Sequence, residues 1–392
     1  MSGSHDSTTR LRFRGSAAIG LTLLVAGTVA ACSQPAAAPP ASSVTPASAT
    51  TVTASPSASA SPTAGSAPLT CDDLVSKADI VRALAAGQPA SDWVVIPTST
   101  VDGSITGQKA LEGAGGLGCS WRAGPPSSEA GVAELIVSVL PGAAKEWTGA
   151  LYGDGPTDQR RTFAGISAAA ACGDPGCGAT AAVGSSWVRV DLMTGPREGA
   201  SPTSAFAKET DDEVFAGLTP AVESALRTVQ GASAAQLRFP DHVPSGQQAP
   251  CTNYLKKASL AEALGVKSTS IDTSFQPDPK VDSLFAAAEL RIGDSVCDLT
   301  DPRYTPAPEL ARVTVAPEQG WAVDDIAAHS AQRGDLRPVA LQGLASGERA
   351  LSSCGSSGNE CSVVFTLGSD AIQVANTPRA NQVAEAILAA AR

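Results

Sequence analysis

The spacing of the cysteines constrains this chain more than any other feature. Apart from Cys32, eight cysteines fall into two sets of four, and the members of the second set follow those of the first by 180, 178, 182 and 184 residues. Such regular offsets indicate an internal duplication of one structural unit. The two sets are Cys71, Cys119, Cys172 and Cys177, and then Cys251, Cys297, Cys354 and Cys361.

Residues between the cysteines repeat as well. Ala83-Leu84 recurs as Ala263-Leu264, and Gly184-Ser185 recurs as Gly368-Ser369. We therefore predict two domains, residues 71–231 and 249–392. The segment between them, residues 232–248, contains two prolines and reads as a linker.

Each repeat has the pattern of an α+β domain. Apolar residues at helical spacing follow its first cysteine, and a second helix is predicted at its end, over 220–229 and 381–391. β-branched and apolar runs between these helices predict strands, and the Gly-Ser pairs predict hairpin turns. The predicted fold is two tandem repeats, each an antiparallel sheet packed with N- and C-terminal helices and braced by two disulfides.

The cysteines are expected to form disulfides, since outside the cytoplasm paired cysteines are far more often bonded to each other than to a metal. Confining the bonds to one repeat leaves three pairings per copy. We predict sequential pairing: Cys71–Cys119, Cys172–Cys177, Cys251–Cys297 and Cys354–Cys361. Neither a Cys-x-x-Cys redox motif nor the ligand spacing of a zinc site is present.

The N-terminus has the layout of a signal peptide. Three arginines precede an apolar run over residues 17–31, which is shorter than the roughly 20 residues that span a bilayer. The run ends in Val29-Ala30-Ala31-Cys32, which resembles the bacterial lipobox. We predict that residues 1–31 are a lipoprotein signal peptide and that Cys32 carries the lipid; an ordinary secretory signal is the alternative.

Residues 32–70 are predicted to be a disordered linker. Ala, Ser, Pro and Thr supply 33 of the 38 residues after Cys32, and none of the 38 is charged or aromatic. Such a segment cannot bury enough apolar surface to offset the entropy of ordering. It would act as a spacer above the membrane, and glycosylation is a second role open to its composition.

The first repeat also resembles a known family. Cys71-x-x-Leu74, followed by Gly118-Cys119-Ser120-Trp121, is similar to actinobacterial envelope lipoproteins of unknown function, in which a cysteine-bearing helix precedes a Gly-Cys-x-Trp strand. The four-cysteine plan is distantly similar to the extracellular sensor domain of mycobacterial receptor Ser/Thr kinases. In the second repeat Val296-Cys297-Asp298-Leu299 lacks the glycine and the tryptophan. The resemblance implies a fold and a location, and no chemistry.

The common catalytic motifs are absent from the sequence. The chain has no Gly-x-Ser-x-Gly elbow, Ser-x-x-Lys pair, phosphate-binding loop or His-Glu-x-x-His sequence. The histidines after the signal peptide, His242 and His329, have no counterparts in the other copy. Two acidic clusters, 211–213 and Asp272 with Asp278 and Asp282, lack the spacing of a calcium loop, so solvated surface or a helix N-terminus explains them as well. We predict no cofactor and no bound metal.

Tryptophans are the best candidates for a binding surface in a chain with only 4% aromatic residues. Trp187 has Ala371 as its repeat mate, so it could serve binding in one copy only. We predict Trp147 and Trp187 as the candidate ligand surface, with core packing as the alternative for both and as the preferred interpretation for Trp121.

The formal net charge of −11 excludes a nucleic-acid-binding surface, which needs clustered Lys and Arg. The sequence predicts a non-catalytic lipoprotein on the outer face of the cell membrane that binds or senses a cell-wall, lipid or protein ligand. A facing Asp–Glu pair in a pocket would instead indicate an extracytoplasmic hydrolase using carboxylates. A chain without any concave site would indicate a structural envelope spacer.

Overall fold

The structure is a computed structural model. It describes residues 67–85, 96–97, 104–123, 133–151, 159–173, 176–194, 206, 209–244, 250–267, 271–275, 281–333, 336–355 and 360–392. The predicted signal peptide, Cys32, most of the predicted linker over 32–70, and Trp93 lie outside these residues. Both repeats belong to one structural unit, residues 61–392.

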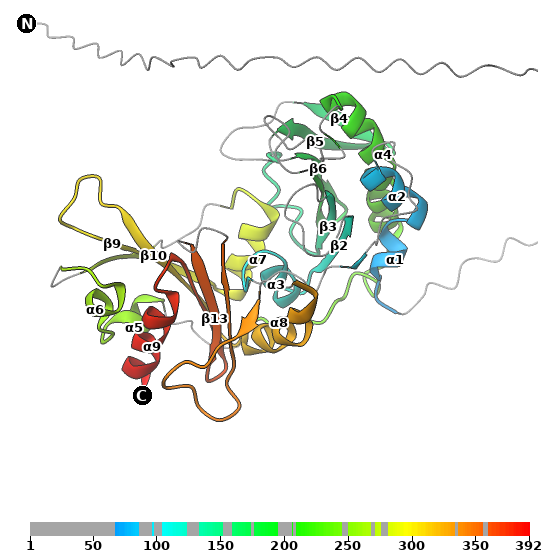
Figure 1. Ribbon diagram of the computed structural model, residues 1–392. Coiled ribbons are helices and arrows are strands. Elements are labelled where there is room, and N and C mark those ends of the chain that lie inside the picture. The colour runs from blue at the N-terminus through cyan, green and yellow to red at the C-terminus, as the bar shows by residue number, and fades with distance from the viewer. Residues whose placement is uncertain are drawn as a thin grey trace, which may run out of the picture. The chain divides into compact units, whose positions relative to one another are not determined.

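The first repeat contains a seven-stranded antiparallel sheet with the order β1-β2-β3-β7-β6-β5-β4 (Figure 1). Along its central strands β3 and β7 every second residue is valine or leucine, a pattern that suits a sheet with one face in a core. The strands are β1 (Ile96–Pro97), β2 (Leu117–Ala123), β3 (Ala133–Leu140), β4 (Arg160–Phe163), β5 (Ile166–Gly173), β6 (Gly176–Val183) and β7 (Ser186–Met193).

The second repeat forms another seven-stranded antiparallel sheet, with the order β8-β9-β10-β14-β13-β12-β11. Strand by strand, this is the order of the first sheet. The α+β duplication predicted from the cysteines is therefore present in the topology. The strands are β8 (Asp272–Phe275), β9 (Ser295–Thr300), β10 (Glu309–Ala316), β11 (Arg337–Pro338), β12 (Ala350–Cys354), β13 (Cys361–Leu367) and β14 (Asp370–Thr377).

Both predicted hairpins form at the Gly-Ser pairs. Gly184 and Gly368 have φ values of 59° and 63°, a left-handed conformation that glycine adopts without steric cost. Val183 then pairs with Ser186, and Leu367 pairs with Asp370, across two-residue turns.

One face of each sheet is covered by helices of the same repeat. In the first repeat α2 and α4 pack together against this face, and in the second α9 packs on β13 and β14 (Figure 1). The α4 helix begins earlier than predicted because Thr210 and Glu213 form a capping box. The helices on these faces are α1 (Cys71–Leu74), α2 (Lys77–Ala85), α4 (Asp211–Gly231), α5 (Thr252–Leu255), α6 (Leu260–Leu264) and α9 (Ala380–Ala391).

All four predicted disulfides are present: Cys71–Cys119, Cys172–Cys177, Cys251–Cys297 and Cys354–Cys361. The two long bridges tie the start of each repeat to its second strand. The two short ones join residues that face each other across adjacent strands, Cys172 with Cys177 and Cys354 with Cys361.

Three further helices were not predicted: α3 (Gln108–Gly113), α7 (Leu284–Ile292) and α8 (Gly320–Arg333). Helices α3 and α7 occupy matching places, each directly before the second strand of its repeat, and they pack against each other. Their shared core also takes in the other face of the first sheet through Leu140 and Trp187. The two repeats are thus joined by a buried apolar contact made from equivalent helices.

Ile105, just before α3, belongs to a second apolar cluster to which both repeats contribute. It is 1% exposed and packs with Val323 of α8 and Val364 of the second sheet. The first repeat therefore supplies part of the core of the second.

The described part of the predicted linker over 232–248 packs against both repeats. Phe239 is buried in the core of the first repeat, and the backbone N–H of His242 donates to Gly113 O at 2.8 Å. Gln319 of the second repeat donates to His242 O at 2.6 Å, and the imidazole of His242 stacks on Trp321. This part of the segment fastens the repeats together. No helix among the described residues is both long and apolar enough to cross a membrane.

Candidate functional site

A polar pocket lies where the first repeat meets the second sheet. Its volume is about 480 Å³, and it is bounded by Thr106 from the first repeat and by residues from α7, β9, β10 and β14 of the second. The lining residues are Thr106, Glu289, Asp294, Val296, Arg312, Thr314, Gln373, Ala375 and Asn376. We call this space the inter-repeat pocket.

Gln373 of β14 holds the first repeat against this pocket. Its Oε1 accepts hydrogen bonds from Ser104 Oγ at 2.8 Å and from the backbone N–H of Ile105 at 3.2 Å. Its Nε2 donates to Ser362 Oγ at 3.2 Å. The amide is therefore already engaged on both sides and has a structural role.

Glu289 projects from the last turn of α7. Its Oε1 accepts from the backbone N–H of Gly107 at 3.2 Å, which again joins the two repeats. Burial raises the pKa of Glu289, the hydrogen bond from Gly107 opposes that shift, and the Asp282 carboxylate adds to it. Glu289 is thus a partly covered carboxyl group with one oxygen left for other contacts.

Asp294 follows the left-handed Gly293 that ends α7. Both of its carboxylate oxygens are buried, and neither has a hydrogen-bond partner among the described residues. Burial raises the pKa of Asp294 well above its ordinary value, and the nearby charge of Glu289 raises it further. An unpaired buried carboxyl group is costly, so its position at a pocket is the strongest indication of a ligand in this structure.

Arg312 is the only cationic residue among the described residues that line the pocket, and carboxylates outside the lining hold it. Its Nε lies 2.8 Å from Asp298 Oδ1 and its Nη2 lies 3.0 Å from Glu309 Oε2. Its charge is compensated, so the carboxyl groups of Glu289 and Asp294 dominate the electrostatics of the pocket.

The first repeat has an apolar pair where the second has these two acids. Cys119 and Cys297 differ by 178 residues in number, and the same offset relates Gly115 to Gly293, whose φ values are 74° and 72°. By the same offset, Leu111 is equivalent to Glu289 and Gly116 is equivalent to Asp294. In the first copy Leu111 fills the space: a Cβ on Gly116 would lie 2.2 Å from its Cδ1.

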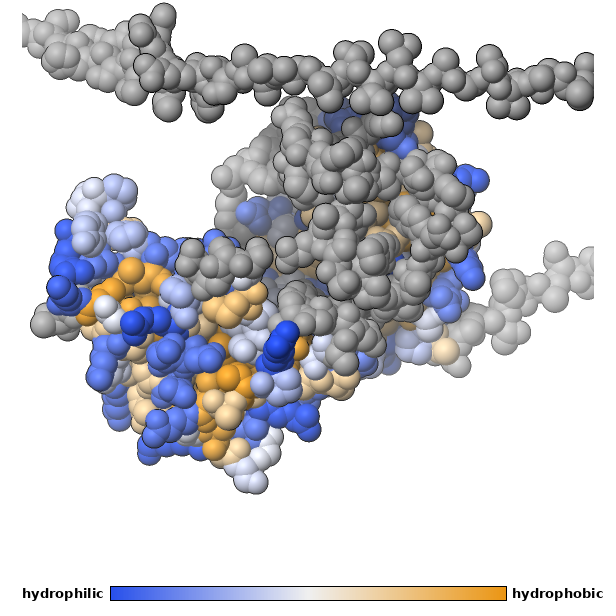
Figure 2. Space-filling model, in the orientation of Figure 1, coloured by the Kyte–Doolittle hydropathy of each residue, from blue (hydrophilic) through white to orange (hydrophobic). Residues whose placement is uncertain are grey.

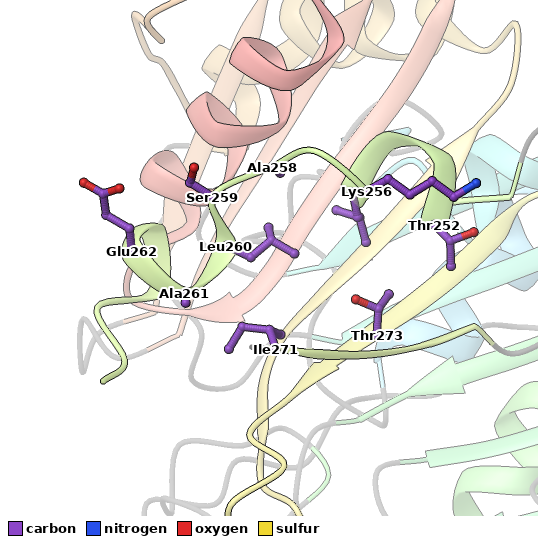
Figure 3. A pocket seen from close by; sticks show the side chains of 10 residues that line it. Thr252, Lys256, Ala258, Ser259, Leu260, Ala261, Glu262, Ile271 and Thr273 are labelled. Carbon is purple, nitrogen blue, oxygen red and sulfur yellow. The ribbon is translucent and has the colours of Figure 1, made fainter. Parts of the chain in front are cut away.

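A second pocket, of about 460 Å³, lies within the second repeat between β8 and the segment carrying α5 and α6. Figure 3 shows Leu260 and Ile271 on its two sides, with the Glu262 carboxylate turned away from them. Lys256 donates to Asn253 at 2.8 Å. Most of its lining is apolar or hydroxyl-bearing, and it contains no buried unpaired group among the described residues.

The structure corrects the prediction for Trp187. The side chain is 1% exposed, lies in the core shared by α3 and α7, and donates from Nε1 to Thr180 Oγ1 at 2.6 Å. A ring enclosed in this way offers no surface to a ligand. Trp121 is buried as well, as preferred above.

Trp147 is only half-buried and packs against the same shared core. The Arg160 guanidinium lies 4.9 Å from its ring centroid, an arrangement typical of a cation–π contact. Trp147 does not line either pocket. The structure therefore does not join it to Trp187 as one ligand surface.

The acidic clusters and the histidines have local roles in the described residues. Residues 211–213 form the first turn of α4, where negative charge is favourable. His329 contacts the backbone carbonyl of Asp325. Asp278 lies outside the described residues.

Among the described residues, one group of three potential metal ligands lies close together: Cys172, Cys177 and Asp211. The two sulfurs are bonded to each other, so they offer no thiolate to a metal.

Glu289 and Asp294 were not among the residues predicted from the sequence. The sequence feature that points to them is the alignment of the two copies around the matching glycines, Gly115 and Gly293. There, Glu289 and Asp294 of the second copy stand where the first has a leucine and a glycine. Both residues are positions at which an uncharged residue of the first repeat is replaced by an acid in the second.

Comparison with protein-family models, with curated proteins and with solved structures gives no match for this chain.

Proposed function

We propose that this protein is a non-catalytic envelope lipoprotein, anchored by a lipid on Cys32, whose paired repeats bind a ligand in the inter-repeat pocket. The observation that carries the proposal is the unpaired Asp294 carboxyl group at a pocket bounded by both repeats. A structural spacer has no need for a costly buried acid at such a place.

The surface favours a polar ligand over a lipid. On the visible face of the second repeat hydrophilic residues predominate, and hydrophobic residues lie in separate areas (Figure 2). The large apolar side chains exposed among the described residues, Val243, Phe275, Leu290 and Tyr304, come from different segments. Together with the polar lining of the pocket, this supports a cell-wall component or a polar group of a partner protein as ligand.

Binding in the inter-repeat pocket is tested by filling it. Ala375→Trp would place an indole in this pocket, and Thr273→Trp would do the same in the second pocket, so the two variants are matched controls. The lipidated full-length protein is purified in detergent and retained ligand is measured by native mass spectrometry. We expect loss of ligand in Ala375→Trp alone; equal retention by both variants would contradict the proposal.

The location is tested separately through Cys32. Cys32→Ala removes the predicted lipid site, and we expect the variant to leave the membrane fraction because no acyl chain holds it there. Ser33→Ala, next to it, is the control and should fractionate like the original protein. Unchanged fractionation of Cys32→Ala would refute the anchor.

A carboxylate hydrolase is the second candidate, because Glu289 and Asp294 lie in one pocket and influence each other electrostatically. A glycosidase needs both carboxyl groups at the scissile bond. The buried oxygens of Asp294 do not meet that need, so we place binding first. Turnover of a retained ligand that stops in Glu289→Gln would reverse this order.

A further inference from the structure

We infer that the inter-repeat pocket binds the ammonium group of its ligand at Glu289, and that the buried carboxyl group of Asp294 becomes ionised and adds a second negative charge when the ammonium group is bound. The inference rests on the proposed binding function and names the chemical class of the ligand. Glu289 is the contact residue, and Asp294 acts through its charge.

The hydrogen-bonding inventory of the pocket favours a donor ligand. The Gln373 amide is engaged by Ser104, Ile105 and Ser362, and Arg312 is held by two carboxylates. Of the carboxylate oxygens on the described residues that line the pocket, one of Glu289 and both of Asp294 accept no hydrogen bond. An ammonium group supplies N–H donors and no acceptor, so it matches this set.

The charge of the pocket leads to the same ligand class. Three titratable residues line the pocket in its described part: Glu289 of α7, Asp294 just before β9, and Arg312 of β10. Three more carboxyl groups interact with these residues, namely Asp282 before α7, Asp298 of β9 and Glu309 of β10. The described residues of β14 that line the pocket are not titratable. Among the described residues, five carboxyl groups therefore surround one guanidinium. A cation relieves their mutual repulsion, whereas an anionic ligand would add to it.

A metal ion fits this set less well. Calcium takes six to eight oxygen ligands, and no group of three carboxylates among the described residues converges closely enough to begin such a shell. The first repeat supports a dedicated role for the two acids, since its matching residues, Leu111 and Gly116, close the same space with apolar packing.

Binding of an ammonium group should release protons from the site. Burial keeps the carboxyl groups of Glu289 and Asp294 protonated to higher pH than usual, and an adjacent cation favours their ionised forms. Proton release on binding therefore distinguishes an electrostatic role of Asp294 from a merely structural one.

The test uses glucosamine as an ammonium probe, N-acetylglucosamine as its uncharged match, and Ca²⁺ alone as the metal arm. Binding to the full chain is measured by isothermal titration calorimetry near pH 6 in two buffers that differ in ionisation enthalpy. We expect glucosamine to bind at least about ten times more tightly than N-acetylglucosamine, with net proton release, and Ca²⁺ to have no effect.

Variants locate the effect. Glu289→Gln should abolish glucosamine binding. Asp294→Asn should weaken it about tenfold and reduce the proton release, and Glu262→Gln, an equal charge change at the second pocket, should alter neither.

The outcomes also separate the two proposals. Equal binding of both sugars, or binding of Ca²⁺ alone, would overturn the ammonium inference and leave a ligand pocket in place. If no probe binds and Ala375→Trp retains the native ligand, the proposed function fails as well.

Discussion

The Lys109 ammonium lies 2.7 Å from Asp325 Oδ2, although the first residue belongs to α3 of the first repeat and the second to α8 of the other. Lys109 is 2% exposed and also contacts Glu112 at 2.7 Å. Burial works against its charge, but the two carboxylates outweigh burial and raise the pKa of Lys109. The pair is a charged contact inside a largely apolar junction.

We expect a double-mutant cycle of Lys109→Met and Asp325→Asn to give a coupling energy of about 1 to 2 kcal/mol in urea unfolding, since the ammonium is shielded from water. The control cycle uses Arg349 and Asp324, a pair in which both side chains are 60% exposed. Its coupling should stay below about 0.5 kcal/mol because solvent screens it. Equal couplings would show that the buried position adds nothing.

Gly116→Ala tests the packing that replaces the acids in the first repeat. The added Cβ would meet Leu111 Cδ1 at 2.2 Å and the Leu111 carbonyl oxygen at 2.9 Å, so the backbone must shift. We expect the free energy of unfolding to fall by about 1 to 3 kcal/mol. Gly173→Ala, whose Cβ would meet nothing within 4 Å, should leave it nearly unchanged.

The long and short disulfides should differ in their contribution to stability. Replacing Cys71 and Cys119 by alanine opens a loop of 48 residues, and replacing Cys172 and Cys177 opens one of 5. Because each bridge lowers the chain entropy of the unfolded state, its removal should lower the free energy of unfolding, by about 4 kcal/mol for the long bridge and about 2 kcal/mol for the short one. Denaturant titration of the two double variants measures both, and a larger cost for the short bridge would contradict the entropic account.

The buried Asp294 should make stability depend on pH. Its pKa is raised in the folded state, so below the ordinary pKa of 3.8 both states carry the proton and there is no penalty. As the pH rises from there toward the higher folded pKa, the unfolded state loses its proton first and the folded state is penalised. Asp294→Asn removes this penalty.

We therefore expect Asp294→Asn to raise the free energy of unfolding by at least about 1 kcal/mol at pH 8, and by much less at pH 4. Thermal unfolding of both proteins across this range gives the difference curve. Asp282→Asn is the control for loss of one negative charge nearby, and a flat difference curve for Asp294→Asn would argue against a buried charge.

Much of the fold could be predicted because the duplication doubled each signal. The cysteine offsets confined the disulfides to single repeats, where the predicted sequential pairing is present, and the hairpins followed from Gly184 and Gly368, where a two-residue turn needs a left-handed φ. Helices α3 and α7 escaped prediction because they are short and rich in apolar residues, with Ala110, Leu111, Ala287 and Ala288 buried against the other repeat. Their helical state depends on tertiary contact more than on local pattern.

The candidate site was less predictable because it is made by that same contact. Thr106 reaches the pocket only when the repeats are docked, and the burial of Asp294 is a tertiary property. Tryptophan scarcity drew attention to Trp187, but its large ring and single donor suit a core position beside Thr180 equally well. The pattern did not distinguish these uses.

The pairing of α3 with α7 bears on how the chain arose. A single copy of the repeat would leave the apolar residues of this helix uncovered, so two copies could cover each other there, as the subunits of a homodimer do. Fusing their genes would free the two halves to diverge. One half could then keep leucine and glycine to seal the junction while the other acquired a pair of acids, a division of labour that an assembly of identical subunits cannot evolve.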